Sequence, residues 1–286
     1  KFPHGMTGDE YVNLKKEAWR TKNNEEYPEF MSTIFNKPGV LEAYEAGKWI
    51  DWVDEVMGKN GVQQNYNLSI TGGTEKTKIF ASLNYNNEEG LIENDNRKRY
   101  SMRLNLDQSI FSWAKVGFNT NLTYTDGNSR NQGVFVNALT FLPLGDAYDA
   151  DGNINYEYCK DGGKVNPMAD EAKDQYVNNT RSTYFTGNAY LELTPLKGLT
   201  FKSVLGTTLS NSRNGVFFGE KSIANITSGY QAPLAEIYNS ASYAYRWENV
   251  ITYNFTLARD HGLKIRMKQM KVMLRGRSWL HSHSIT

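Results

Sequence analysis

The sequence predicts an all-β protein, in which the strands of an antiparallel transmembrane β-barrel follow a short helical segment. Three observations support this fold class. Apolar and polar residues alternate with a period of two in seven stretches of about ten residues, longer than usual strands. The connections between these stretches alternate between short and long, and the polar phase carries charged side chains. A mean hydropathy of −0.62 is compatible with a barrel, because only alternate residues of each strand face lipid.

The first sixty residues are predicted to form helices. Thr7 and Glu10 have capping-box spacing, so a helix is expected to begin after Thr7. A second short helix is expected around residues 40–45. The aromatic and acidic run 48–54 follows, and Gly58 and Gly61 end the helical pattern.

The seven predicted strands are 65–71, 79–86, 100–107, 114–124, 185–193, 199–209 and 243–255. Short turns at 73–76, 108–113 and 195–198 alternate with long loops at 88–98, 126–181 and 211–241. A soluble meander has no reason to place every long loop at one edge. Outer-membrane barrels do so, because their periplasmic turns are short and their extracellular loops long.

Alternate residues of each strand form two sets, or phases. One phase is apolar and is predicted to face lipid. Its members are Leu68, Ile70, Ile79, Leu83, Met102, Leu104, Val116, Phe118, Leu191, Leu193, Phe201, Leu205, Ile251, Tyr253 and Phe255. Aromatic residues gather toward the strand ends, where membrane-interface girdles lie: Tyr66, Tyr85, Tyr100, Trp113, Tyr124, Phe185 and Tyr243.

The other phase carries charges that suit a water-filled lumen better than a core: Arg103, Asp107, Lys115, Glu192, Lys202, Arg246 and Glu248. The alternative is a soluble antiparallel sheet, since half-buried sheets have the same alternation. Under that alternative the chain is a soluble β-rich carbohydrate-binding or interaction module.

The net charge of +1 averages two different compositions. Residues 258–286 contain seven basic residues and one acidic residue, whereas the preceding 257 contain 25 basic and 30 acidic. The strand pattern of 243–255 continues for only about five residues beyond Gly262 before a basic, Met-rich string replaces it. We interpret residues 258–286 as an anomalous tail, a frameshift or truncation scar, rather than as a nucleic-acid-binding segment.

No enzymatic chemistry is predicted. One cysteine and four histidines exclude a disulfide scaffold and a Cys/His zinc site, and no catalytic triad, paired carboxylates or phosphate loop is present. The acidic run 146–153 does not have the EF-hand pattern, so we expect a polar turn there. We therefore expect no catalytic, cofactor-binding or metal-binding residues.

The run from Gln63 to Lys78, with its Gly72-Gly73 pair before a polar turn, resembles the SusC/RagA family of TonB-linked outer-membrane transporters. The segments 81–85, 89–92, 98–107 and 113–117 are also similar to that family, as are 8–11, 51–52, 149–153, 166–167 and 197–203. Each motif is weak alone, and the set is specific. The resemblance spans roughly residues 5–258.

The resemblance implies a 22-stranded barrel in the Gram-negative outer membrane, of which this chain holds about seven or eight strands and neither plug nor TonB box. It implies import of oligosaccharides or peptides. The expected partners are a SusD-like lipoprotein, the TonB complex acting through the plug, and outer-membrane lipid; no nucleic acid is expected.

The resemblance also suggests three regions: a helical loop region at 1–62 after the first barrel strand, strands and extracellular loops at 63–257, and the tail at 258–286. The sequence begins without an initiator Met and without the apolar segment of a signal peptide, so we expect a mature product or a fragment.

Four aromatic residues are predicted substrate contacts, because apolar sugar faces stack on flat rings: Trp49, Trp52, Tyr184 and Tyr190. The alternative for Trp49 and Trp52 is a role as packing anchors of a loop. The alternative for Tyr184 and Tyr190 is packing against the plug.

Overall fold

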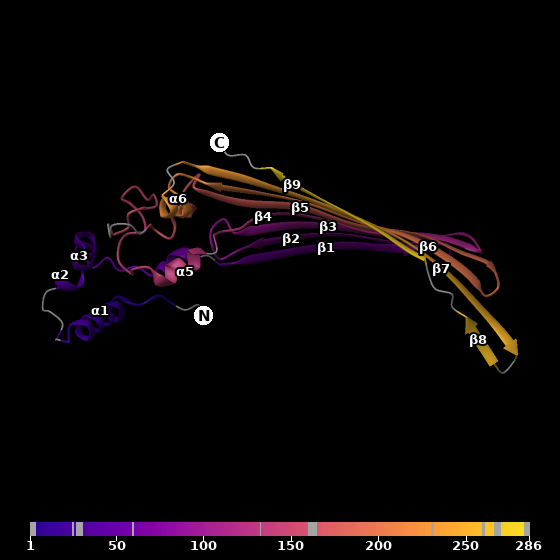
Figure 1. Ribbon diagram of the computed structural model, residues 1–286, viewed down its shortest axis with the longest axis horizontal. Helices are drawn as coiled ribbons and strands as arrows, with labels where there is room; N and C mark the ends of the chain where they lie inside the picture. Colours follow the sequence, from indigo (N-terminus) through magenta and orange to yellow (C-terminus); the bar gives the residue numbers. More distant parts are fainter. Residues whose placement is uncertain are drawn as a thin grey trace.

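The computed structural model describes residues 4–24, 26, 31–58, 60–131, 133–159, 165–229, 232–258, 261–265 and 270–282. One long antiparallel sheet dominates it (Figure 1). The strands are β1 Val62–Gly73, β2 Thr77–Glu89, β3 Asn96–Phe111, β4 Ala114–Asn128, β5 Tyr176–Leu196, β6 Leu199–Phe218, β7 Leu234–Ala258, β8 His261–Ile265 and β9 Met270–Ser282. Strands β1 to β7 contain all seven predicted stretches, so the predicted antiparallel β architecture is confirmed.

The strands pair in sequence order from β1 to β7, and the sheet is open rather than closed into a barrel. Within the described chain, β1 pairs only with β2. Both β8 and β9 pair with β7, at successive parts of the same edge: β8 opposite 253–258 and β9 opposite 237–249. The described backbone of the basic tail, residues 261–265 and 270–282, thus continues the sheet, while residues 259–260, 266–269 and 283–286 lie outside the described part.

Connection lengths alternate as predicted. The turns 74–76, 112–113 and 197–198 lie at one end of the sheet, and the loops 90–95, 129–175 and 219–233 lie at the other. Helices α1, α2, α3, α5 and α6 lie toward this loop end (Figure 1), and α4 contacts α5 there. Within the described residues, no helix has the length and apolar character required to cross a membrane.

The helices are α1 Gly8–Asn23, α2 Met31–Ile34, α3 Pro38–Glu45, α4 Trp52–Met57, α5 Gly133–Thr140 and α6 Ile223–Ser228, with a 3-10 turn η1 at Ala169–Glu171. The predicted capping box is present, because Thr7 and Glu10 exchange backbone-to-side-chain hydrogen bonds. Asp51 caps α4 by accepting a 2.9 Å hydrogen bond from the Val53 amide. Helices α2, α5 and α6 were not predicted.

The hydrophobic core lies at the loop end, outside the sheet. It joins the N-terminal segment to the β4–β5 loop and contains Phe35, Val40, Ala43, Trp52, Val53, Val56, Val134, Ala138, Leu144, Ala147, Tyr158, Cys159 and Met168. Here Ile50 donates to the Pro143 carbonyl at 3.3 Å, and Lys48 pairs with Asp146 at 2.5 Å. We name this unit, residues 31–57 with the described part of 129–175 (129–131, 133–159 and 165–175), the loop module. The sequence predicted helices and a loop separately, and the structure packs them as one unit.

Candidate functional site

The two faces of the sheet differ sharply in chemistry. Strand register places seven apolar side chains directly opposite one another in a single row across β1 to β7: Leu68, Leu83, Met102, Leu122, Phe185, Leu209 and Tyr243. Leu68 is 71% exposed and Leu83 55% exposed, so this apolar face has no cover within the described chain. A row one residue away holds Ser69, Ser82, Arg103, Asn121, Thr186 and Thr208. We name these the apolar face and the polar face.

The residues predicted to face lipid lie on the apolar face. Leu68, Ile70, Ile79, Leu83, Met102, Leu104, Phe118, Leu191, Leu205, Ile251 and Tyr253 are exposed there. Val116, Leu193 and Phe201 are half-buried, and the side chain of Phe255 lies outside the described part. Whether these side chains contact lipid stays a prediction.

A row of tyrosines bounds the apolar face at its loop end. Tyr66, Tyr85, Tyr100 and Tyr124 lie opposite one another on β1 to β4, with ring centroids 6.3, 5.0 and 6.3 Å apart. Phe185 on β5 and Tyr243 on β7 belong to the row of Leu122, which lies two residues closer to the turn end than the tyrosine row. At the turn end the rings of Phe111 and Trp113 stack at 5.3 Å.

The distance between the two aromatic boundaries matches a bilayer. Trp113 and Tyr124 are eleven positions apart, which is about 36 Å along a strand and about 26 Å high at a tilt of 45°. The apolar band of outer-membrane barrels is about 25 Å tall. The apolar face therefore has the height needed to cross an outer membrane.

The polar face carries a charged cluster near the turn end. The Tyr190 hydroxyl donates to Asp107 at 2.7 Å, and the Lys202 ammonium lies 4.3 Å from the centre of the Tyr190 ring. Lys202 also pairs with Glu192 at 3.4 Å. Gly117 lies between Asp107 and Tyr190 in the register, and its missing side chain leaves the space that the ring occupies. Tyr190 is thus held by contacts within the sheet.

The four predicted substrate contacts do not converge on one site. Trp52 is 2% exposed and donates to the Leu142 carbonyl at 2.8 Å, so a ligand cannot reach its ring in this structure. Trp49, in the loop module, is 39% exposed and packs over Gly8 at the start of α1. Tyr184, 44% exposed, and Tyr190 share the polar face of β5, about 20 Å apart by strand rise.

Three loops meet at a buried charged cluster that the sequence did not predict. Arg130 pairs with Glu171, and these side chains are 5% and 8% exposed. Asn94 donates to Glu171 at 3.3 Å, and Asp170 accepts a 2.8 Å hydrogen bond from the Ile223 amide. Burial raises the pKa of both Asp170 and Glu171, although nearby Arg130 acts in the opposite direction. The sequence did not indicate this cluster, because its members lie far apart in the chain. The cluster connects the β2–β3, β4–β5 and β6–β7 loops.

The acidic run 146–153 is a polar turn, as predicted. Asp149 accepts hydrogen bonds from the amides of Asp151 and Asn153 at 3.0 and 2.8 Å. Across the described ranges there is no group of three His, Cys, Asp or Glu side chains placed to hold a metal ion.

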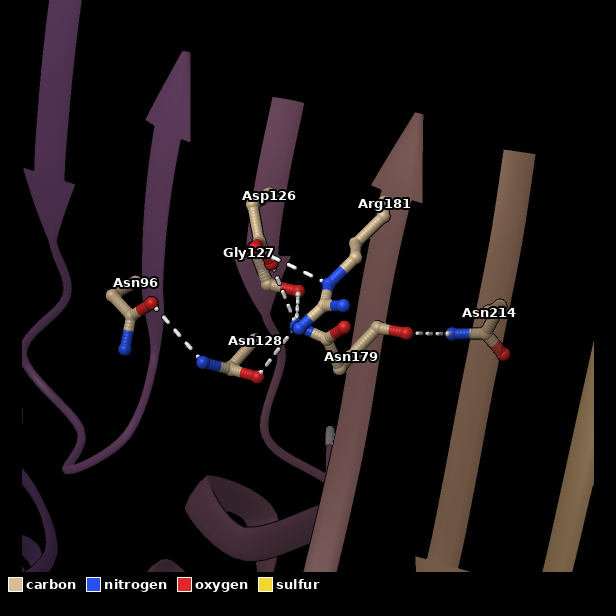
Figure 2. A network of polar contacts seen from close by, with 7 residues as sticks. All are labelled: Asn96, Asp126, Gly127, Asn128, Asn179, Arg181 and Asn214. Carbon is tan, nitrogen blue, oxygen red and sulfur yellow. Dashed lines mark hydrogen bonds and ion pairs between the residues drawn. The ribbon is translucent and has the colours of Figure 1, made fainter. Parts of the chain in front are cut away.

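A polar network lies beyond the tyrosine row, on the loop side of the apolar face (Figure 2). Asn128 donates to Asn96 at 3.2 Å, and Asn179 donates to Asn128 at 3.0 Å, so three strands are linked side chain to side chain. Asn179 also donates to Asp126 at 2.8 Å, and Arg181 pairs with Asp126 at 3.3 Å. On the loop side of the tyrosine row, the side chains on this side of the sheet are therefore polar instead of apolar.

Comparison with known proteins agrees with this geometry. No family model matches the chain. A TonB-dependent receptor of Formosa agariphila is 28% identical over 212 residues, 74% of this chain and 21% of the relative. TonB-dependent receptor SusC of Bacteroides thetaiotaomicron is 29% identical over 125 residues, 44% of this chain and 10% of SusC. The chain therefore spans about a fifth or less of the length of these relatives.

A solved structure of the RagAB peptide transporter shares the fold. Its TM-score is 0.69 at 22% identity, and the match covers 91% of this chain and 31% of the other. Similar sequence over most of the chain and shared fold over nine-tenths of it make this protein a relative of the TonB-dependent receptors of the SusC/RagA kind, with the architecture of part of their β-barrel.

Proposed function

We propose that the chain is part of an outer-membrane TonB-dependent transporter that imports oligosaccharides or peptides. The observation that carries this proposal is the apolar face, about 26 Å high between its aromatic boundaries, on a sheet whose other face is polar and charged. The relatives that are TonB-dependent receptors, and the RagAB peptide transporter, support transport rather than catalysis.

The three predicted regions enter this proposal with distinct roles. Strands in 63–257 cross the membrane, and residues 1–62 form part of the extracellular surface. A SusD-like lipoprotein captures substrate above the loops, and the TonB complex acts through a plug on the polar face. Residues 258–286 are a frameshift or truncation scar; an intact reading frame through codon 286 in the resequenced gene would contradict that origin.

Tyr184 is the predicted contact residue best placed to meet substrate, because it is exposed on the polar face and no hydrogen bond within the described chain fixes its hydroxyl. Replacing Tyr184 with Ala in the native full-length protein should reduce uptake of the preferred oligosaccharide or peptide. Tyr100→Ala, on the apolar face, is the matched control. Equal uptake by both variants would remove Tyr184 from the proposal.

Fractionation of cells that produce the native full-length protein tests the membrane assignment. We expect recovery only in the outer-membrane fraction, released by detergent. Appearance in the soluble fraction without detergent would refute the barrel and favour the alternative, a soluble β-rich carbohydrate-binding or interaction module. Growth of a deletion strain on single glycans and on peptides then distinguishes the two substrate classes.

A further inference from the structure

A row of charged side chains crosses the apolar face just beyond the tyrosine row. Strand register places Lys98, Asp126, Arg181 and Arg213 directly opposite one another on β3 to β6. Lys98 is two residues from Tyr100, and Asp126 is two residues from Tyr124, so the row points to the same side as the tyrosines. We name Lys98, Arg181 and Arg213 the basic row.

The cations of this row outnumber the carboxylates that could neutralise them. Asp126 is shared between the Arg181 Nε at 3.3 Å and Asn179 (Figure 2). Arg181 remains 54% exposed, so this contact orients its guanidinium without covering it. Within the described ranges, no carboxylate forms an ion pair with Lys98 or Arg213.

Two hollows meet at the two arginines. One, of about 320 Å³, is lined by Tyr124, Arg181 and Arg213 together with Asn211 and Asn239. The other, of about 570 Å³, lies toward the loops and is lined by the whole basic row. Its lining includes Gly215, and a Cβ there would meet no atom within 4 Å. The arginines therefore stand beside open space that a small anionic group can enter.

The carboxylates near this space do not cancel its charge. Glu236 also lines the larger hollow, and it accepts a 2.5 Å hydrogen bond from the Tyr238 hydroxyl. Its register partner Val216 belongs to the polar-face phase of β6, opposite to the phase of Arg213. Three cations and two carboxylates leave a net positive charge, concentrated at Arg213 and Lys98.

We propose that the basic row binds a phosphate group on the headgroup of an outer-leaflet membrane lipid. The proposal rests on the proposed membrane function, because it places the tyrosine row at the interface and the basic row at the height of the headgroups. Paired guanidinium groups match the geometry of phosphate oxygens, and basic clusters at this depth bind anionic headgroups. Tyr124 joins the apolar face to the smaller hollow, so a lipid's acyl chains would continue along that face.

The test uses the native full-length protein, extracted from membranes in detergent and analysed by native mass spectrometry. The probes are phosphatidic acid and diacylglycerol, which differ only in the phosphate. We expect the wild type to retain at least five times as much phosphatidic acid as Arg213→Gln. The double variant, which carries both Arg181→Gln and Arg213→Gln, should retain even less. Arg103→Gln, on the polar face of β3, should retain as much as the wild type, and diacylglycerol should not distinguish the variants.

Other outcomes would overturn the proposal. The proposal is wrong if Arg213→Gln retains as much phosphatidic acid as the wild type. It is also wrong if Arg103→Gln loses as much phosphatidic acid as Arg213→Gln does. Displacement of the lipid by millimolar inorganic phosphate would assign the row to a free anion, and an acidic protein that co-purifies only with the wild type would assign it to a protein partner. Failure of the membrane function itself is seen earlier, as protein in the soluble fraction before any lipid is added.

Discussion

At the residue scale, Gly117 shows how a missing side chain positions its neighbours. Tyr190 on β5 lies over Gly117 on β4 and reaches across it to Asp107 on β3, while Lys202 covers the ring. A side chain at position 117 would overlap both the ring and, at 2.6 Å, the Asp107 carboxylate. The glycine is therefore part of the cluster although it contributes no polar group.

Gly117→Ala should move the Tyr190 ring and break its hydrogen bond to Asp107. We expect a loss of about 1–3 kcal/mol in the free energy of unfolding, the usual range for overpacking. The temperature at which the native full-length protein loses its folded mobility on semi-native gels reports this loss. Gly72→Ala is the control, because a Cβ at position 72 meets nothing within 4 Å; equal shifts in both variants would contradict this account.

At the element scale, the loop module depends on Trp52, which belongs to α4 and bonds to the β4–β5 loop. Its ring also makes edge contacts with Phe141 and Tyr158, at centroid distances of 6.4 and 5.1 Å. The sequence could not indicate these partners, because Phe141 and Tyr158 lie 89 and 106 positions downstream of Trp52. Alternation predicted the strands well because sheet faces are local patterns, whereas packing between distant loops follows no local period.

Trp52→Ala should loosen the loop module without disturbing the sheet. Removing a buried tryptophan costs about 3–5 kcal/mol, so residues 129–175 should become sensitive to protease. Limited proteolysis of the native protein on intact cells measures this effect. Trp49→Ala is the matched control with a smaller expected effect, because Trp49 is 39% exposed. If the protease cleaves Trp52→Ala no faster than the wild type, Trp52 does not anchor the loop module.

The buried carboxyl groups of the loops predict a pH dependence. Burial raises the pKa of Asp170 and Glu171, so the folded loops bind protons more readily than the unfolded loops. Their contribution to stability is full below the unfolded values near pH 4 and decreases as pH rises through the raised values. Hydrogen exchange around η1, corrected for intrinsic rates, should therefore show greater protection at pH 5 than at pH 7.5. Asp170→Asn should weaken this dependence, and greater protection at the higher pH would contradict the assignment.

At the scale of the whole molecule, the open sheet and its apolar face mean that the proposed membrane function requires further strands beside β1. Strand β1 is exposed along its whole length, and unpaired backbone groups are not tolerated in a bilayer. The strand positions, turn pattern and two-faced chemistry followed from the sequence. The tail's pairing with β7 did not, because the apolar alternation stops before β9 begins.

Expressed alone, the 286-residue chain should aggregate through its edges and its apolar face. Size-exclusion chromatography in detergent and semi-native gels are the measurements. A monodisperse species whose gel mobility changes on heating would contradict this prediction.

The union of residues 31–57 with 129–175 has a consequence for biosynthesis. Trp52 precedes its partner Leu142 by 90 residues, and β1 to β4 are made in between. Under the proposed membrane function, Val53 and Val56 of α4 stay uncovered until the fourth strand and the loop after it reach the same side of the membrane. Such distant pairings form late, because loop closure must precede them.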